Sequence, residues 1–283
     1  MMNQLYRLIC RMYDVGKRKI VDPLLDGHPH AQQKFIATKD WVKRHFFPSR
    51  EMWVQVEAGA ARGTWMHVRL PKENGLWSGR NEPYLQEMLP QLLRPGESVY
   101  DIGAHLGTIT FGMAKLAGAT GKVVAFEADP TNVARLEKIC VRNGLQERVR
   151  VVHAAVWSRT AQDGIDFRRG IETAYGGVES DGERPVLATG ELIRVPAITL
   201  DDFVAQGGPT PEFIKVDVEG GEYEVLRGGS LLFATKRPVV IVEVHTARAA
   251  EKIARWLVEF DYAAEWYRSR DEFPHQMIAR PAK

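Results

Sequence analysis

Two acidic residues and two glycines have the types and the spacing of a ligand site. Residues 98–115, SVYDIGAHLGTITFGMAK, contain a short strand that reaches Asp101, a turn from Gly103 to Gly107, and the start of a helix. His105 stands where the G-x-G-x-x-G fingerprint of dinucleotide-binding proteins has its middle glycine. A carboxylate at Asp101 is poorly placed for a pyrophosphate but suits a cation, and a helix N-terminus favours a carboxylate. The turn therefore predicts a ligand with an amino acid moiety.

Glu127 is the second acidic residue, at the end of the next predicted strand and 24 residues after Gly103. An acid at that place can accept hydrogen bonds from both hydroxyls of a ribose. The third strand ends in small residues within HAAV, residues 153–156, which would let an adenine ring lie against the backbone. Ribose and amino acid together indicate S-adenosylmethionine as the ligand.

The residues that could activate an acceptor follow two later strands. Methyl transfer needs a nucleophile held about 3 Å from the carbon and in line with the breaking bond. An alcohol also needs a base or a metal. In FIKVDVEG, the period of two puts Lys215, Asp217 and Glu219 on one face, and the next strand supplies Glu243 and His245.

We predict that His245 is the general base, because the unperturbed pKa of histidine is near 6.5. Asp217 and Glu219 complete the predicted catalytic set. Lys215 is expected to pair with Glu243 across neighbouring strands, since an isolated buried charge is very costly. Magnesium bound by Asp217, Glu219 and either Glu243 or His245 is the alternative way to activate the hydroxyl. We expect a base and no metal.

The elements that position these residues alternate between strand and helix from residue 97 onward. Strands are expected at 98–103, 122–128, 149–156, 212–220 and 238–244, and helices at 107–118, 130–144, 221–233 and 247–260. Apolar strands that alternate with amphipathic helices indicate a mostly parallel sheet with helices on both faces. An insertion at 157–212, with short strands at 164–167 and 193–200, is expected to carry acceptor specificity.

Residues 1–80 differ from the rest of the chain. Two helices, a hairpin of strands 52–58 and 64–70, and a loop at 71–79 are expected. We predict that this extension covers the active site or forms a subunit interface, such as that of a homodimer, and that residues 81–283 form the S-adenosylmethionine-binding domain. The basic residues 17–19 after an amphipathic first helix leave peripheral membrane contact as an alternative.

Composition limits the classes of function. The chain has 283 residues, 45% of them apolar and 26% charged, with a net charge of +2. That balance is ordinary for a soluble globular protein and argues against a nucleic-acid partner. Cys10 and Cys140 are too isolated for a disulfide framework or a zinc site, and no signal peptide or membrane span is recognised. We expect a cytoplasmic protein.

Six segments resemble the FkbM family of S-adenosylmethionine-dependent methyltransferases: VYDIGAHLG, KVVAFEADPTNVARLEKICVRNGL, VRVVHAAVWS, VPAITLDDF, FIKVDVEGGEYEVLRGG and VVIVEVH. They lie between about residues 97 and 246. The resemblance implies an α/β, Rossmann-like class I methyltransferase fold, with a seven-stranded sheet whose last strand is antiparallel. It also implies O-methylation of a hydroxyl on a sugar, a glycolipid or a polyketide-type natural product.

The sequence departs from the family at His105, where asparagine is common, and at Ala128, where proline is usual. GLWSGRNEPYL also resembles the family, which typically has a glutamate at the position of Glu82. The predicted cofactor contacts are Glu82, Asp101, Gly103, Ala104, His105, Gly107, Thr108, Glu127, Ala128, Ala154, Ala155 and Asp217. An N-methyltransferase, a non-catalytic scaffold subunit and an NAD-dependent oxidoreductase are the competing functions, and the missing middle glycine argues against the last.

Overall fold

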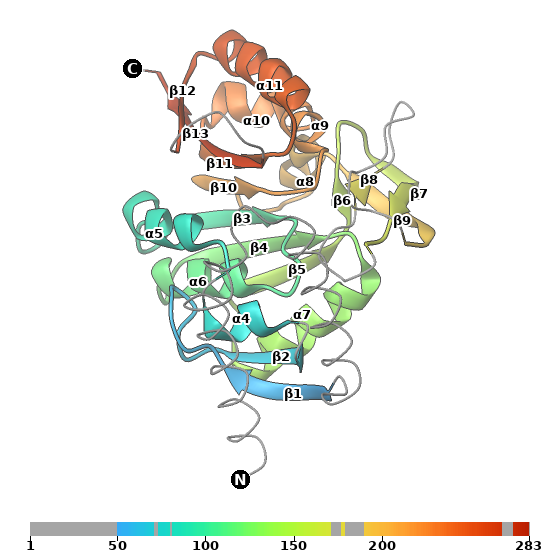
Figure 1. Ribbon diagram of the computed structural model, residues 1–283. Helices are drawn as coiled ribbons and strands as arrows, with labels where there is room; N and C mark the ends of the chain where they lie inside the picture. Colours follow the sequence, from blue (N-terminus) through green and yellow to red (C-terminus); the bar gives the residue numbers. More distant parts are fainter. Residues whose placement is uncertain are drawn as a thin grey trace, which may run out of the picture.

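A seven-stranded sheet forms the centre of the computed structural model, which describes residues 50–70, 73–79, 81–170, 177–178, 190–267 and 274–282 (Figure 1). The strands are β3 (Ser98–Ile102), β4 (Lys122–Glu127), β5 (Val149–His153), β10 (Phe213–Val216), β11 (Val239–Val244), β12 (Tyr262–Trp266) and β13 (His275–Pro281). Their order is β12-β13-β11-β10-β3-β4-β5, and β13 runs antiparallel to both of its neighbours. The predicted class I methyltransferase sheet is confirmed.

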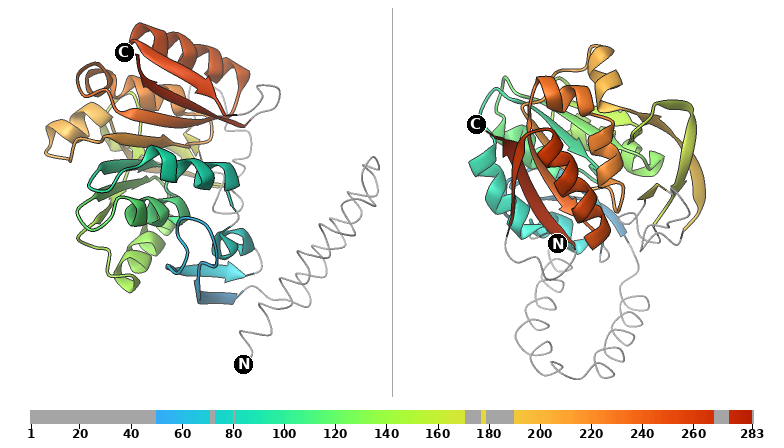
Figure 2. Two further views of the ribbon diagram at one scale, coloured as in Figure 1. Left: turned by 90° about the vertical axis from the view of Figure 1, so that its left-hand side faces the viewer. Right: turned by 90° about the horizontal axis from the view of Figure 1, so that it is seen from above.

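Helices cover both faces of this sheet (Figure 2). They are α5 (Pro83–Leu92), α6 (Thr108–Leu116) and α7 (Pro130–Arg142) on one face, and α8 (Leu200–Ala205), α9 (Glu222–Arg227), α10 (Ser230–Thr235) and α11 (Ala247–Glu259) on the other. Successive residues of a strand point to opposite faces. On β3, Val99 packs in the core beneath α6, whereas Tyr100 and Ile102 pack in the core beneath α8 and α11.

Two predicted elements are interrupted in the structure. The helix expected at 221–233 is two helices, because Gly228 lies so close to the chain at Trp157 that a Cβ atom there would be 2.1 Å from the Trp157 carbonyl oxygen. The strand expected at 149–156 divides at Ala154 into β5 and β6 (Ala155–Val156). Both breaks occur where the insertion joins the main sheet.

Three strands of the insertion and the short strand before it form a second sheet of four strands beside the first (Figure 1). Its members are β6, β7 (Ala161–Arg168), β8 (Gly177–Val178) and β9 (Leu192–Ile198), in the order β6-β9-β7-β8. The two strands expected in this insertion are therefore present. Arg169, just after β7, ties the insertion to the start of α7: its Nε and Nη2 donate to the Asp129 carboxylate over 2.8 and 2.7 Å.

The predicted hairpin is also confirmed, as β1 (Arg50–Gln55) paired with β2 (Trp65–Leu70). It lies at the opposite end of the molecule from α11 (Figure 1, Figure 2). The prediction of a loop at 71–79 is wrong in part, since this segment contains the short helix α4 (Asn74–Ser78). The two helices expected before residue 50, with any membrane or dimer contact they make, lie outside the described residues. No helix of the described part is long and apolar enough to span a membrane.

The hairpin shares a hydrophobic core with the main domain. Val54, Met66 and Val68 belong to the same buried cluster as Phe111 of α6 and Leu136 of α7. The hairpin is therefore packed against the main domain, and the prediction that residues 1–80 cover the active site or form a subunit interface stays a prediction.

A buried ion pair fixes the hairpin to α7. Arg135 makes two hydrogen bonds to the Glu73 carboxylate, of 2.8 and 2.6 Å, and a third to the His67 carbonyl. The two side chains are only 6% and 11% exposed.

We expect Glu73→Gln to lower the free energy of unfolding by about 3 kcal/mol, because removing one member of a buried pair leaves the other charge without compensation. Urea denaturation measures this value. Glu51→Gln is the matched control on the same hairpin, since the Glu51–Arg69 pair is largely exposed and should contribute under about 1 kcal/mol. Equal losses in the two variants would contradict the anchoring role of Arg135.

Candidate active site

One cavity of about 330 Å³ brings together almost all of the predicted site residues. It opens between the carboxyl ends of β3, β4 and β10 and the insertion. Its wall includes Glu82, Gly103, Ala104, His105, Gly107, Thr108, Glu127, Ala128, Ala154, Ala155, Asp217 and Glu219. Asp101 and His245 do not line it and lie behind residues that do. The cofactor contacts remain predictions, and all of the predicted ones except Asp101 line this one cavity.

The turn after β3 requires glycine at Gly103. This residue has a φ of 80°, and a Cβ atom there would be 1.8 Å from the carbonyl oxygen of Asp217. The amides of Gly103 and Ala104 both donate to the Phe126 carbonyl on β4. The backbone of β3 therefore approaches the ends of β4 and β10 more closely than a side chain would allow.

A buried lysine lies directly beneath this turn. The Lys215 ammonium is 3.0 Å from the Gly103 carbonyl, 3.2 Å from Oδ1 of Asp101 and 3.4 Å from Oδ2 of Asp217. Asp101 also accepts a hydrogen bond of 2.6 Å from Thr110. Burial alone would lower the pKa of Lys215, but these carboxylates raise it above its ordinary value. Lys215 is therefore a cation.

The predicted pairing of Lys215 with Glu243 is wrong. In the sheet register Lys215 lies opposite Asp101 on β3 and Ile241 on β11, so Glu243 is two residues further along. Glu243 accepts a hydrogen bond of 3.0 Å from Gln276 on the antiparallel strand β13 instead. Asp101 is completely buried, so it contacts Lys215 and not the cavity.

Glu127 presents a fixed carboxylate to the cavity. Its Oε1 accepts a hydrogen bond of 2.8 Å from the Asp129 amide, and its Oε2 accepts one of 2.7 Å from the His105 amide. Each carboxylate oxygen has a second lone pair. Burial raises the pKa of Glu127 to about 7, although these hydrogen bonds oppose the shift. The Asn132 side chain also donates a hydrogen bond to this carboxylate, and the acceptor capacity that remains can bind a hydroxyl group.

Unsatisfied polar atoms in the wall indicate that the cavity suits a polar ligand. Among the described residues, Oε2 of Glu82 and Oγ1 of Thr108 are buried without a hydrogen-bond partner. Such atoms are rare in folded proteins and call for an explanation. Burial raises the pKa of Glu82 to about 8, against the attraction of Lys215. Thr108 is the first residue of α6, where a carboxylate is favoured.

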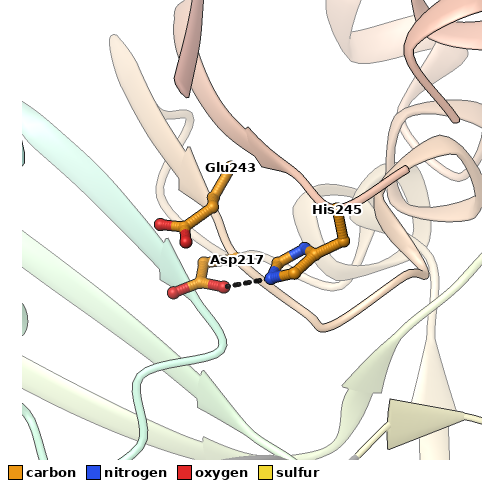
Figure 3. A group of neighbouring side chains, drawn as sticks. All are labelled: Asp217, Glu243 and His245. Carbon is orange, nitrogen blue, oxygen red and sulfur yellow. Dashed lines mark ion pairs between the residues drawn. The ribbon is translucent and has the colours of Figure 1, made fainter. Parts of the chain in front are cut away.

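His245 lies among carboxylates at the end of β11, beside Glu243 and opposite Asp217 (Figure 3). Its Nδ1 is 2.6 Å from Oε1 of Glu222, and its Nε2 is 3.3 Å from Glu219 and 3.9 Å from Asp217. Burial favours the neutral ring, but the hydrogen bond and charge of Glu222, with Glu219 and Asp217, raise the pKa of His245 to about 9. His245 was predicted to be the general base because the unperturbed pKa of histidine is near 6.5. That premise is wrong, since a ring with a pKa of about 9 holds its proton at neutral pH.

Glu219 is the carboxylate beside His245 that meets the conditions of a base at neutral pH. It lines the cavity, and burial raises its pKa to about 7 while the His245 charge opposes the shift. A metal is the other activator considered above, and ligand atoms of Asp217, Glu243 and His245 lie within 4.8 Å of one another. A metal binds only the neutral imidazole, so it would first have to displace the proton that the surrounding carboxylates hold on His245.

Two contributions to this site were not predicted residue by residue. The insertion supplies Trp157, Phe167 and Val178 to the cavity wall, next to the alanines after β5. Glu222 was not among the predicted site residues, and its bond to His245 depends on how the chain turns at Gly220 and Gly221. The signal that could have found it is a second acid three residues after Glu219, in the first turn of a short helix.

Comparison of the sequence with those of known protein families finds a match over more than half of the chain. Residues 101–268 match the methyltransferase FkbM domain. The chain is 26% identical to the hexuronic acid methyltransferase AglP of Haloferax volcanii over 253 residues, which are 85% of this chain and 94% of that protein. It is 28% identical to the 31-O-demethyl-FK506 methyltransferase FkbM of Streptomyces tacrolimicus over 181 residues, which are 56% of this chain and 69% of that protein.

Among solved structures, a methyltransferase FkbM from Methylobacillus flagellatus superposes with a TM-score of 0.49 at 18% identity. The superposition covers 67% of this chain and 45% of that one, so the present chain spans less than half of that structure.

We expect the imidazole of His245 to titrate near pH 9, and NMR of the histidine rings measures the midpoint. The chain has 8 histidines, so His245→Gln identifies the signal. Because the folded pKa lies above the unfolded value of about 6.5, the ion pairs of His245 stabilise the protein fully below that pH, and this stability is lost as the pH rises through 9. A midpoint at or below the unfolded value would refute the assignment.

Proposed function

This chain belongs to the FkbM family of methyltransferases, and on that premise we propose that it transfers the methyl group of S-adenosylmethionine to a hydroxyl of a sugar, a glycolipid or a polyketide-type product. The observation that carries the proposal is the carboxylate of Glu127, held by two backbone amides in the same cavity as the glycine turn and the start of α6. In this proposal Glu127 binds the ribose, the glycine turn lies beside the methionine backbone, and the start of α6 receives the methionine carboxylate.

The class of acceptor is supported by the relatives and by the charges of the cavity. The names of the two relatives specify a hexuronic acid and 31-O-demethyl-FK506 as the compounds they act on. An amine acceptor is the alternative, but Asp217, Glu219 and Glu243 would favour its protonated form, which has no lone pair for attack. A hydroxyl meets no such obstacle, so O-methylation is the reaction we propose.

When bound, S-adenosylmethionine supplies a methyl group already activated by its sulfonium. Glu219 would accept the proton that the acceptor hydroxyl loses when its oxygen is methylated, and the cofactor would leave as a neutral thioether. Lys215 holds Asp217 beside Glu219 through an ion pair of 3.4 Å. Trp157, Phe167 and Val178 of the insertion exclude water from the other side of the cavity. The protonated His245 stabilises the ionised form of Glu219 before the proton moves.

The insertion and the N-terminal extension have separate proposed roles. Because the insertion contributes apolar wall residues beyond those predicted for the cofactor, we propose that it determines which acceptor enters. Residues 1–80 would cover the site or form a subunit interface, and Glu82, just beyond them, links α5 to the cavity.

We expect the purified protein to bind S-adenosylmethionine and not NAD in isothermal titration calorimetry. Glu127→Ala should weaken S-adenosylmethionine binding by about 1.5–3 kcal/mol, the value of hydrogen bonds to a charged group. Glu137→Gln, on the exposed side of α7, is the control and should bind as the wild type does. Unchanged affinity in the Glu127 variant would exclude the ribose contact.

We expect a mass gain of one CH₂ group in an acceptor from a panel of uronic acid glycosides, neutral glycosides and macrolides. Where chemistry limits the rate, wild-type turnover should rise as the pH increases through about 7, because Glu219 must be ionised. Glu219→Gln should lower kcat by about 10²–10⁴ and abolish this pH dependence, with unchanged cofactor affinity.

Two results would overturn the base assignment: full activity of Glu219→Gln, or loss of activity on chelation with recovery on adding magnesium. Methylation confined to amines in the panel would overturn O-methylation.

A further inference from the structure

A continuous line of polar contacts runs from the protein interior to the cavity wall. It begins at Glu222, the first residue of α9, whose side chain is completely buried. Oε1 of Glu222 is 2.6 Å from Nδ1 of His245, and Nε2 of the same ring is 3.3 Å from Oε2 of Glu219. Glu219 lines the cavity, whereas Glu222 and His245 do not. The imidazole therefore connects the interior carboxylate to the cavity wall through side-chain contacts.

Glu222 is held in place from two sides. Its Oε1 also accepts a hydrogen bond of 2.8 Å from the Gly220 amide, in the turn that carries Glu219. Its ion-pair partner in the part of the chain that the structure describes is His245. A completely buried carboxylate requires such a partner, because an isolated charge in the interior is very costly. The contact is the shortest of the three that His245 makes with acidic side chains.

This contact determines the direction of the other ring nitrogen. The hydrogen bond at one nitrogen of an imidazole sets which nitrogen carries the proton and how the ring is turned. With Nδ1–H donated to Glu222, Nε2 faces Glu219 and, 3.9 Å away, Asp217. The acidic groups near His245 are thus Asp217 and Glu219 after β10, Glu222 on α9 and Glu243 on β11, and Lys215 is the neighbouring cation on Asp217.

We propose that Glu222 is a positioning residue for methyl transfer: acting through His245, it keeps Nε2 directed at Glu219 on the acceptor side of the cavity. This inference rests on the proposed function, in which Glu219 receives the acceptor proton. The imidazolium stabilises the ionised form of Glu219, so the loss of the Glu222 charge weakens that support. A residue that only closed the turn at Gly220 would leave the imidazole unchanged.

The experiment compares Glu222→Gln, which keeps the shape and removes the charge, with Glu222→Asp, which keeps the charge. The control is Glu224→Gln on the same short helix, whose side chain pairs with Arg227 near the surface. NMR of the His245 ring and calorimetry with S-adenosylmethionine are measured on the full chain. The pH dependence of kcat follows with the acceptor identified above.

In Glu222→Gln we expect the His245 midpoint to fall by about one to two pH units, the value of one charged hydrogen bond. The rise of kcat should move to higher pH, because the attraction between His245 and the Glu219 charge outweighs the direct repulsion from Glu222. KM and cofactor affinity should change less than about twofold. Glu222→Asp should recover most of the wild-type behaviour. An unchanged His245 midpoint in Glu222→Gln would overturn the proposal.

A second measurement needs no variant at position 222. Above the midpoint, the neutral ring of wild-type His245 should carry its proton on Nδ1, as the bond to Glu222 requires, and an Nε2–H form would overturn the proposal even if Glu222→Gln failed to fold. Failure of the proposed function is recognised separately, since calorimetry would then show no binding of S-adenosylmethionine by the wild type while the ring measurements still decide the role of Glu222.

Discussion

The arrangement of the site depends on one buried cation, the ammonium of Lys215. Parallel strands end at the same edge of a sheet, so a single side chain on β10 reaches Asp101 on β3, the Gly103 carbonyl in the turn and Asp217 at its own strand end. Without it, the completely buried Asp101 would be an uncompensated charge, which costs several kcal/mol. The same contacts fix the glycine turn and the carboxylate beside Glu219. The proposed cofactor side and the proposed acceptor side of the cavity therefore share one anchor.

The fold could be predicted from sequence because its signals are local. Apolar runs bounded by Gly103, Asp129 and Pro130 mark where strands end and helices begin, and Asp129 accepts a hydrogen bond from the Thr131 amide as a helix cap does. The breaks were missed because they result from contacts between distant segments. The residues around Gly228 give no local signal that the chain at Trp157 lies against them, and the predicted helix is interrupted at that contact.

The sequence predicted most of the residues that lie at the site, but it did not predict which of them form ion pairs with one another. The period of two placed Lys215, Asp217 and Glu219 on one face, yet the register between strands decides which acid lies opposite the lysine, and it is Asp101. The pKa of His245 was misjudged for a related reason. Its strongest partner, Glu222, is brought to it by the turn at Gly220 and Gly221, and a histidine flanked by three acids holds a proton that an isolated one would lose.

Burial explains why the carboxylate of Glu219, ordinarily a weak base, can accept a proton in the proposed reaction. Around the cavity, Glu82, Asp217, Glu219 and Glu243 outnumber the cations Lys215 and His245, and burial raises the pKa of three of these acids. A carboxylate that is poorly solvated gains more from accepting a proton than one in water does. The proposed reaction would consume one negative charge at Glu219 and one positive charge on the cofactor. Because both charges disappear together, an enclosed site that would destabilise either of them alone favours the step.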